Sequence, residues 1–322
     1  MIVITGAAGF IGSHLAEGLA EKGFRDLVLV DDFSIPEKKA NWSDLVYQAL
    51  VHRDDFFHWL QNHHRQVQYV FHLGARTNTL EQDEEVLNRL NFEYSQHVWE
   101  HCVRFGLPMC YASSAATYGD GSLGFDDDLS IIHQLQPLNP YGWSKHRFDL
   151  WALEQKRKPV QWVGLKFFNV YGNRENHKGR MASVVLHAYQ QIASTQELKL
   201  FKSYRKDVPD GEQKRDFIFV KDLVIMMINI MLDRRITGIY NAGTGCARSF
   251  NELSTIIFEA LGLPEKVVYV DMPDVLQKQY QYFTRANMIS FFKNKSLIFT
   301  PIEDGVSEYV RELQKGNSSS IL

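Results

Sequence analysis

Cysteine is scarce in this chain, and its spacing supports neither a disulfide scaffold nor a structural zinc site. Three cysteines, Cys102, Cys110 and Cys246, occur among 322 residues, and none belongs to a Cys-x-x-Cys pair. An odd number without paired spacing is not typical of a disulfide framework or a zinc site. The histidine and acidic residues show no metal-ligand spacing either. We therefore expect no metal and a reducing compartment.

Long apolar runs and an excess of positive charge are also missing. No segment approaches the roughly 18 apolar residues of a membrane-spanning helix, and the opening MIVITGAAGF lacks the basic segment of a signal peptide. The formal net charge of −3 gives no broad basic field for nucleic acid or an anionic membrane. We expect a cytoplasmic protein that binds neither nucleic acid nor membrane.

Short apolar strands alternate with helical patterns along the first half of the chain. We predict strands at 1–5, 26–30, 68–73, 108–112 and 160–168, with helices at 11–22 and 94–105 among them. This alternation predicts an α/β fold, a Rossmann-type doubly wound parallel sheet covered by helices on both faces.

The pattern loosens after about residue 169, where the charged stretch 202–215 reads as a loop. A strand at 216–220, a helix from Lys221 and a strand at 238–243 follow. We assign residues 1–168 plus 216–243 to the dinucleotide-binding domain. Residues 169–215 plus 244–315 then form a smaller, discontinuous α/β substrate-binding domain, and 316–322 a disordered tail.

A glycine-rich turn follows the first predicted strand. Gly6, Gly9 and Gly12 stand where the strand should pass into a helix. The first permits a tight turn, the second lets the backbone approach a pyrophosphate, and the third lets the helix pack closely on the sheet. The N-terminus of that helix offers N–H groups to the phosphates. The turn predicts a bound dinucleotide.

The coenzyme itself stays open between NAD and NADP. Asp31, at the end of the second strand, can bind the adenosine ribose and would repel a 2′-phosphate. Lys38 and Lys39 follow closely and Arg53 comes later, and any of these cations could pair with that phosphate.

Tyr141 and Lys145 stand four residues apart, so they share one face of a helix. A positive lysine beside the phenol, together with an oxidised nicotinamide, should lower the pKa of Tyr141. Such a tyrosine can take the proton of an alcohol while hydride leaves its carbon. Ser114, after the strand at 108–112, would hydrogen-bond the same oxygen.

Several motifs together carry a family resemblance. TGAAGFIG, YASSAATYG, NPYGWSK and FFNVYG resemble the extended short-chain dehydrogenase/reductase family, whose members act on nucleotide sugars. FFNVYGNRENHKGRMASV, KRDFIFVKDL, NAGTGCARSF and YQYFT are similar, more narrowly, to its heptose-epimerase branch. That branch inverts one carbinol centre of an ADP-linked heptose, a lipopolysaccharide precursor, with tightly held NADP. The resemblance covers nearly the whole chain and implies a homo-oligomer.

The resemblance assigns roles to individual residues. It implies that Tyr141 is one catalytic acid/base, that Lys178 is a second and also meets the cofactor, and that Lys145 binds the cofactor. Without it, Lys178 would read as a solvated surface lysine. The remaining cofactor contacts that it implies are Phe10, Ile11, Asp31, Asp32, Lys38, Arg53, Leu73, Gly74, Ala75, Arg76, Thr77, Asn91 and Val170. The implied substrate contacts are Ser114, Asn169, Arg180, His187, Phe201, Arg215 and Tyr280.

The chain departs from the branch pattern at several positions. Asn173 replaces a proline, Lys166 stands where arginine is common, and Arg180 replaces a small polar residue expected to touch substrate. The loop 202–214 is also longer. Arg215 could clamp a diphosphate or instead form a structural ion pair with Asp216 or Asp222.

Other functions remain compatible with these motifs. Another enzyme of the same fold, such as a UDP-hexose 4-epimerase, would use the same turn and Ser–Tyr–Lys set. A dehydratase needs an acidic pair where this chain has Ala115 and Ala116. A regulatory protein that binds a dinucleotide without catalysis would commonly lack the tyrosine or the lysine, and this chain keeps both.

Overall fold

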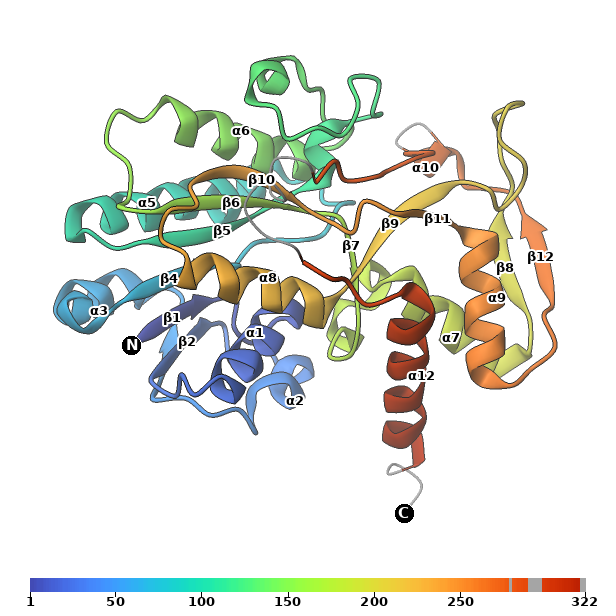
Figure 1. Ribbon diagram of the computed structural model, residues 1–322, viewed down its shortest axis with the longest axis horizontal. Helices are drawn as coiled ribbons and strands as arrows, with labels where there is room; N and C mark the ends of the chain where they lie inside the picture. Colours follow the sequence, from blue (N-terminus) through green and yellow to red (C-terminus); the bar gives the residue numbers. More distant parts are fainter. Residues whose placement is uncertain (278–279, 289–296, 319–322) are drawn as a thin grey trace.

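A seven-stranded sheet dominates the computed structural model, which describes residues 1–277, 280–288 and 297–318 (Figure 1). Its strands lie in the order β10-β6-β5-β4-β1-β2-β3, and every neighbouring pair is parallel. The bounds are β1 Ile2–Thr5, β2 Leu27–Asp31, β3 Ala49–His52, β4 Tyr69–His72, β5 Met109–Ser114, β6 Trp162–Phe167 and β10 Gly238–Ala242.

Helices cover both faces of this sheet. In Figure 1, α5 (Tyr94–Phe105) and α6 (Pro140–Glu154) lie on one side, and α1 (Phe10–Glu21) and α8 (Val220–Leu232) lie on the other. Shorter helices are α2 (Lys39–Trp42), α3 (Phe56–His63) and α4 (Glu84–Leu87). The predicted fold class, a doubly wound parallel sheet with a smaller α/β part, is confirmed.

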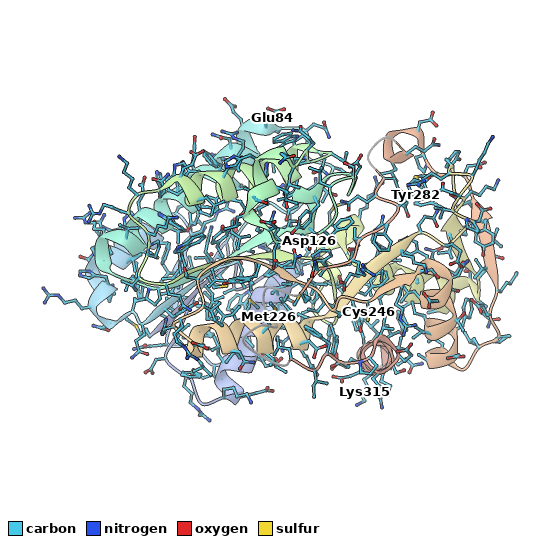
Figure 2. All side chains as sticks on the ribbon, turned by 45° about the horizontal axis from the view of Figure 1, so that its top comes forward. Glu84, Asp126, Met226, Cys246, Tyr282 and Lys315 are labelled. Atoms are coloured by element: carbon cyan, nitrogen blue, oxygen red, sulfur yellow. The ribbon has the colours of Figure 1, made fainter. Side chains whose placement is uncertain are left out.

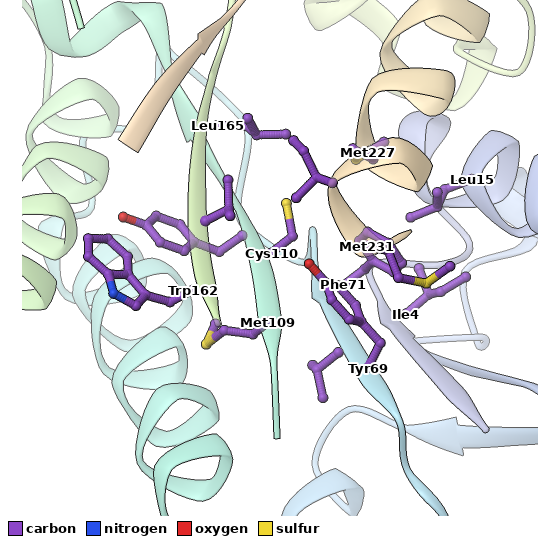
Figure 3. Close-up of a cluster of buried hydrophobic side chains, with 14 of the residues drawn as sticks. Ile4, Leu15, Tyr69, Phe71, Met109, Cys110, Trp162, Leu165, Met227 and Met231 are labelled. Atoms are coloured by element: carbon purple, nitrogen blue, oxygen red, sulfur yellow. The ribbon is translucent and has the colours of Figure 1, made fainter. Parts of the chain in front are cut away.

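The central strands are apolar on both faces because helices pack on both. All residues of β1, β2 and β4 are buried. Figure 3 shows the two sides: Met227 and Met231 of α8 pack near Tyr69 and Phe71 of β4, while Trp162 points to the opposite side. This buried cluster fixes the carboxyl ends of the strands, where the candidate site lies.

A second group of elements has its own hydrophobic core. It holds the sheet β11-β9-β7, with β7 Asn169–Tyr171, β9 Lys214–Phe219 and β11 Ala247–Ser249, and the pair β12-β8, with β8 Leu198–Phe201 and β12 Val267–Val270. Its helices are α7 Val184–Thr195, α9 Phe250–Leu261, α10 Asp274–Gln277 and α12 Ile302–Ser318.

Strand β9 lies between the two cores. Phe217 and Phe219 are buried in the second core, while Ile218, facing the other way, is buried in the first. The strand pairs with β7 and β11, whereas α8 and β10, which follow it, return to the large sheet. The predicted domain division at residue 216 therefore falls inside a strand that contacts both cores.

The C-terminal helix extends into the segment that we predicted to be disordered. Helix α12 runs through Ser318, so residues 316–318 of the predicted tail are helical, and 319–322 lie outside the described residues. No helix in the described part of the chain is long and apolar enough to cross a membrane.

Candidate active site

The glycine-rich turn is closed by backbone contacts that leave no space for side chains. Gly6 has a φ of +72°, and a Cβ there would meet the Gly74 backbone nitrogen at 2.7 Å. A Cβ on Gly12 would meet the Gly6 carbonyl oxygen at 2.2 Å. Helix α1 begins after Gly9, and no side chain in the described residues caps its first turn. The bare turn and the uncapped helix start fit the pyrophosphate of a dinucleotide.

Asp31 and Asp32 lie where β2 ends, beside this turn. The Asp31 carboxylate accepts hydrogen bonds from the Ala8 N–H at 2.9 Å, the Asp32 N–H at 2.7 Å and the Lys38 ammonium at 3.0 Å. Arg53 Nη2 lies 3.6 Å from Asp32 Oδ2. The structure therefore brings two acids and two cations together at the place predicted for the adenosine ribose.

The predicted cofactor segment Leu73–Thr77 follows β4 and is held by hydrogen bonds to Thr5 and Asn91. The Gly74 N–H donates to Thr5 Oγ1 at 3.1 Å. The buried Asn91 side chain accepts from the Arg76 N–H at 2.7 Å and donates to the Arg76 carbonyl at 3.0 Å. It also donates to Ser144 Oγ of α6 at 2.9 Å. Asn91 therefore links the predicted cofactor loop to the helix that carries Tyr141.

Helix α6 presents Tyr141 and Lys145 one turn apart. Asn139 caps its start by accepting from the Gly142 N–H at 2.8 Å, and Pro140 occupies the first helical position. Burial raises the pKa of Tyr141, and a hydrogen bond with Ser114 opposes that rise. Ser114 lies at the end of β5 and Tyr141 at the start of α6, so the fold brings this predicted pair into contact.

The Lys145 ammonium is fixed differently from the prediction. Its Nζ donates to the Ala112 carbonyl oxygen at 2.9 Å, and burial lowers the pKa of Lys145 to about 8. Lys145 is not among the groups that shift the pKa of Tyr141, and the predicted lowering by the lysine together with an oxidised nicotinamide stays a prediction. Burial outweighs the favourable interactions of the phenolate, so the pKa of Tyr141 lies above its ordinary value.

Lys178 lies in a short helical segment, Asn176–Met181, that packs against the dinucleotide turn. Its ammonium is 5.3 Å from the centre of the Phe10 ring. Burial lowers the pKa of Lys178, and Glu175 opposes that change. The neighbouring His177 ring is 3.1 Å from the Asn41 side chain, which also donates to the Ala8 carbonyl at 3.0 Å. Lys178 is therefore half-buried beside the predicted cofactor site.

Arg215 is buried between aromatic rings. Its guanidinium lies 5.1 Å from the Tyr280 ring centre and 5.6 Å from that of Phe250. The alternative ion pairs are wrong, because both acids bond elsewhere: Asp216 accepts from Thr244, Gly245 and Ala286, and Asp222 accepts from Thr300. Among the described contacts, Arg215 lies against the two aromatic rings, and its Nη1 donates to the Lys214 carbonyl oxygen at 2.9 Å.

The other predicted substrate residues are spread over neighbouring elements. Asn169 opens β7, His187 lies in the first turns of α7 and Phe201 ends β8, and all three are half-buried. Val170, next to Asn169, packs against both hydrophobic cores. Arg180 is exposed. No contact in the described residues joins these side chains directly, so their common role stays a prediction.

Four buried polar residues around the site were missed by the sequence interpretation or given no role: Asn41, Asp149, Lys166 and Glu175. Lys166, the replacement for an expected arginine, donates to Thr117 Oγ1 at 2.6 Å and lies 3.5 Å from Asp149 Oδ2. Asp149 also accepts from Ser113 Oγ at 2.7 Å. Asp149 lies one helical turn after Lys145, and this spacing was the one local sequence feature that could have pointed to Asp149.

The candidate residues gather at the carboxyl ends of parallel strands, where open α/β sheets bind ligands. They follow six of the seven strands, β1 to β6, with Arg53 directly after β3. No cluster of metal ligands occurs in residues 1–277, 280–288 and 297–318. The fold and the glycine-rich turn define a class, the Rossmann-fold enzymes that depend on a nicotinamide dinucleotide.

Comparison with known proteins narrows this class. The sequence profile described as "NAD dependent epimerase/dehydratase family" matches residues 2–243. Proteins named ADP-L-glycero-D-manno-heptose-6-epimerase from Fusobacterium nucleatum and Nitratidesulfovibrio vulgaris are 43% and 44% identical, over 97% of this chain and 97% of each relative. The chain belongs to the NAD dependent epimerase/dehydratase family, which confirms the resemblance inferred from its motifs.

Solved structures agree with this assignment. The Helicobacter pylori ADP-L-glycero-D-manno-heptose-6-epimerase superposes with a TM-score of 0.79 at 28% identity, over 97% of this chain and 96% of that chain. A Thermus thermophilus UDP-glucose 4-epimerase complex with NAD superposes with a TM-score of 0.78 at 21% identity, and this second likeness shows the fold alone.

Proposed function

We propose that the protein is an ADP-glyceromanno-heptose 6-epimerase. It inverts C6 of ADP-D-glycero-D-manno-heptose with tightly bound NADP, for synthesis of a lipopolysaccharide inner-core precursor in the cytoplasm. The observation that carries this proposal is the contact of Ser114 with Tyr141 in a chain 43–44% identical to proteins of that name. A second ionisable group, Lys178, packs against the dinucleotide turn.

The coenzyme supplies a hydride acceptor that becomes the hydride donor in the second half of the cycle. The chain's own residues hold it. The turn from Gly6 to Gly12 binds the pyrophosphate, and the segment Leu73–Thr77, fixed by Asn91, lines the path toward Tyr141. Lys145, anchored on Ala112, lies beside that path.

Two acid/base groups on different elements suit an inversion, because the 6-hydroxyl must lose a proton in one orientation and gain one in the other. The pKa of Tyr141 is raised and that of Lys178 is lowered. Tyr141 is therefore held in its protonated form before reaction and has a proton to give, and Lys178 more readily becomes the neutral amine that accepts a proton. In the reverse direction the two exchange roles.

The preference for NADP rests on the cations at the end of β2. The Lys38 ammonium has one described hydrogen bond, to Asp31, and can donate two more. Arg53 is half-buried beside Asp32. A 2′-phosphate placed between these two cations would form charge-assisted hydrogen bonds with them.

The buried guanidinium of Arg215 suits the diphosphate of the substrate, since an arginine fork binds phosphate oxygens in a bidentate manner. Asn169, Arg180, His187, Phe201 and Tyr280 would complete the substrate site. The homo-oligomer expected from the family resemblance remains part of the proposal, and light scattering of the purified protein tests it.

The function is tested by purifying the protein, identifying its bound coenzyme and incubating it with ADP-heptose while NMR follows the configuration at C6. We expect bound NADP and inversion at C6. Turnover of UDP-glucose without inversion of ADP-heptose would replace the proposal by a UDP-hexose 4-epimerase. A coenzyme-free protein inert to every sugar nucleotide would replace it by a regulatory dinucleotide-binding protein.

A further inference from the structure

We propose that the C-terminal helix α12 is part of the catalytic apparatus, because Tyr309 acts through Glu175 to position Lys178. This inference rests on the proposed acid/base role of Lys178. It adds two positioning residues, Glu175 and Tyr309, to the site. Neither is among the residues that the family resemblance implied.

Glu175 is a fully buried carboxylate three residues before Lys178. Its Oε1 accepts from Ser183 Oγ at 2.5 Å and from the Tyr309 hydroxyl at 3.0 Å, and its Oε2 accepts from the Ser183 N–H at 2.6 Å. All three partners can donate, which suits an ionised carboxylate, since that form is an acceptor only. Burial raises the pKa of Glu175, and the hydrogen bonds from Ser183 and Tyr309 and the charge of Lys178 oppose that rise. Glu175 therefore joins the Lys178 segment to the start of α7 and to α12.

Backbone geometry ties Lys178 to this carboxylate. The Lys178 N–H donates to the Glu175 carbonyl oxygen at 2.9 Å. The next residue, Gly179, has φ 50° and ψ −122°, so the segment kinks directly after the lysine. A six-residue segment with a kink has little rigidity of its own. Its position therefore depends on its contacts with other elements, which are those of Glu175 and the contact of His177 with Asn41.

Helix α12 approaches the site closely enough to act in this way. A Cβ on Gly305 would meet the Tyr171 hydroxyl at 2.2 Å, so α12 lies directly against the end of β7, from which the Lys178 segment continues. Tyr309 is buried one turn further along the helix. Lys315, labelled in Figure 2, lies in the last turn of α12.

The charge of Glu175 also bears on the proton affinity of Lys178. Burial lowers the pKa of the lysine and Glu175 opposes it, so removing the carboxylate should lower that pKa further. The titratable and charged groups around the pair are His177 on the same segment, Lys38 and Asp31 near His177, and Tyr309 and Glu312 on α12. Of these, Glu175 is the one that raises the pKa of Lys178.

The proposal is tested with Glu175→Gln, Tyr309→Phe and the double variant in the full-length protein with its coenzyme. Glutamine keeps the shape but accepts through one oxygen and carries no charge. We expect kcat for C6 inversion to fall about ten- to hundredfold in Glu175→Gln and about tenfold in Tyr309→Phe, with KM within about twofold. In Glu175→Gln, the limb of the kcat pH profile that reports Lys178 should move to lower pH.

The kcat of the double variant distinguishes a positioning role of Tyr309 and Glu175 from a packing role, because only a shared positioning role makes the two losses non-additive. If Tyr309 acts through Glu175, adding Tyr309→Phe to Glu175→Gln should change kcat little further. Glu175→Asp, which keeps the charge, should recover part of the lost rate. The matched control is Lys221→Gln, which removes a surface tether of α12, the ion pairs with Glu308 and Glu312, and should leave kcat unchanged.

The outcomes distinguish this inference from the proposed function. Wild-type kcat and pH profile in both single variants, with an inactive Lys178→Met, would overturn the positioning role and leave the function intact. Additive losses with an unshifted profile would also overturn it, in favour of a packing role. An active Lys178→Met would show instead that the proposed catalytic lysine is wrong.

Discussion

The two candidate acid/base residues, Tyr141 and Lys178, belong to very different structural elements. Tyr141 belongs to the 15-residue helix α6, which is capped by Asn139 and packed on a buried parallel sheet. Lys178 belongs to a six-residue segment with a kink at Gly179.

The difference shows two ways of holding a reactive group. On the Tyr141 side, position follows from regular structure, and Asn91 and Ser144 add hydrogen bonds to a helix that is already fixed. On the Lys178 side, position depends on contacts with other elements: Glu175, a buried carboxylate with three donors, and His177, which lies 3.1 Å from the Asn41 side chain. Variants should therefore affect the two sides differently.

The largest effect is expected at the rigid side. Tyr141→Phe removes the phenol while keeping the ring, so kcat for inversion should fall about 10³–10⁴-fold, because a direct proton donor is lost. Coenzyme content and melting temperature should stay near wild type, since the helix is held by other groups. NMR assays of C6 configuration measure the rate.

Tyr240→Phe serves as the control, because it removes a hydroxyl that bonds the Thr237 carbonyl at the far edge of the sheet. It should keep full activity. A Tyr141→Phe enzyme that inverts C6 at a near-normal rate would remove Tyr141 from the mechanism.

The next effect concerns the second group. Lys178→Met and Lys178→Arg should each lower kcat about 10²–10³-fold, because neither side chain can exchange a proton near neutral pH. The melting temperature of Lys178→Met should change by a few degrees at most, since removing a partly desolvated cation offsets the loss of its pairing with Glu175. Activity in Lys178→Arg alone would show that the site needs a charge there rather than a proton carrier.

A smaller effect is expected on the preference for NADP over NAD, which we attribute to Lys38 near the end of β2. Lys38→Ala should weaken NADP binding about tenfold and leave NAD binding nearly unchanged, because the ammonium would pair with the 2′-phosphate. Lys39→Ala is the matched control, since Lys39 is exposed and has no described bond to Asp31. Titration of the coenzyme-stripped protein, followed by fluorescence, gives both affinities. Equal losses for NAD and NADP would contradict this role of Lys38.

The smallest effect concerns stability and pH. His72 is buried beneath the site between Thr5 Oγ1, at 2.7 Å from Nδ1, and Ser95 Oγ, at 2.9 Å from Nε2, and burial lowers its pKa to about 3. A lowered pKa means that the neutral ring is favoured in the folded state. Its stabilising contribution is therefore complete above the unfolded pKa of 6.5 and is lost progressively as pH falls toward 3.

Between about pH 7 and pH 5, this single group should cost about 2 kcal/mol of the free energy of unfolding. His72→Asn should be less stable than wild type at neutral pH, yet it should lose about 2 kcal/mol less over that interval. Urea titrations at the two pH values measure the difference. If the free energy of unfolding fell equally in both proteins between pH 7 and pH 5, His72 would not be the cause of the decrease.

Regular elements could be predicted from the sequence where burial gave a clear pattern. The predicted helix 94–105 is observed as α5, Tyr94–Phe105, and the first strand differs by one residue. Strand β3, Ala49–His52, was missed because it is only four residues long and lies half-exposed at the edge of the sheet. Strands β8 and β12 form a separate pair of four-residue strands and were also missed.

The candidate site likewise has features that could be predicted from the sequence and features that could not. The glycines and the Tyr141–Lys145 pair are short-range patterns whose spacing already implies their geometry. The support of Lys178 joins residues far apart in sequence, with Glu175 and Tyr309 separated by 134 positions. The raised pKa of Tyr141 also escaped prediction, because burial is a property of the folded chain and not of helical spacing.

The most direct measurement is incubation of the purified protein with ADP-D-glycero-D-manno-heptose in D₂O, with NMR of the product. The account predicts that the configuration at C6 inverts and that no solvent deuterium enters at C6, while Tyr141→Phe and Lys178→Met leave the substrate unchanged. Failure to invert C6, or inversion accompanied by solvent deuterium at that carbon, would contradict the account.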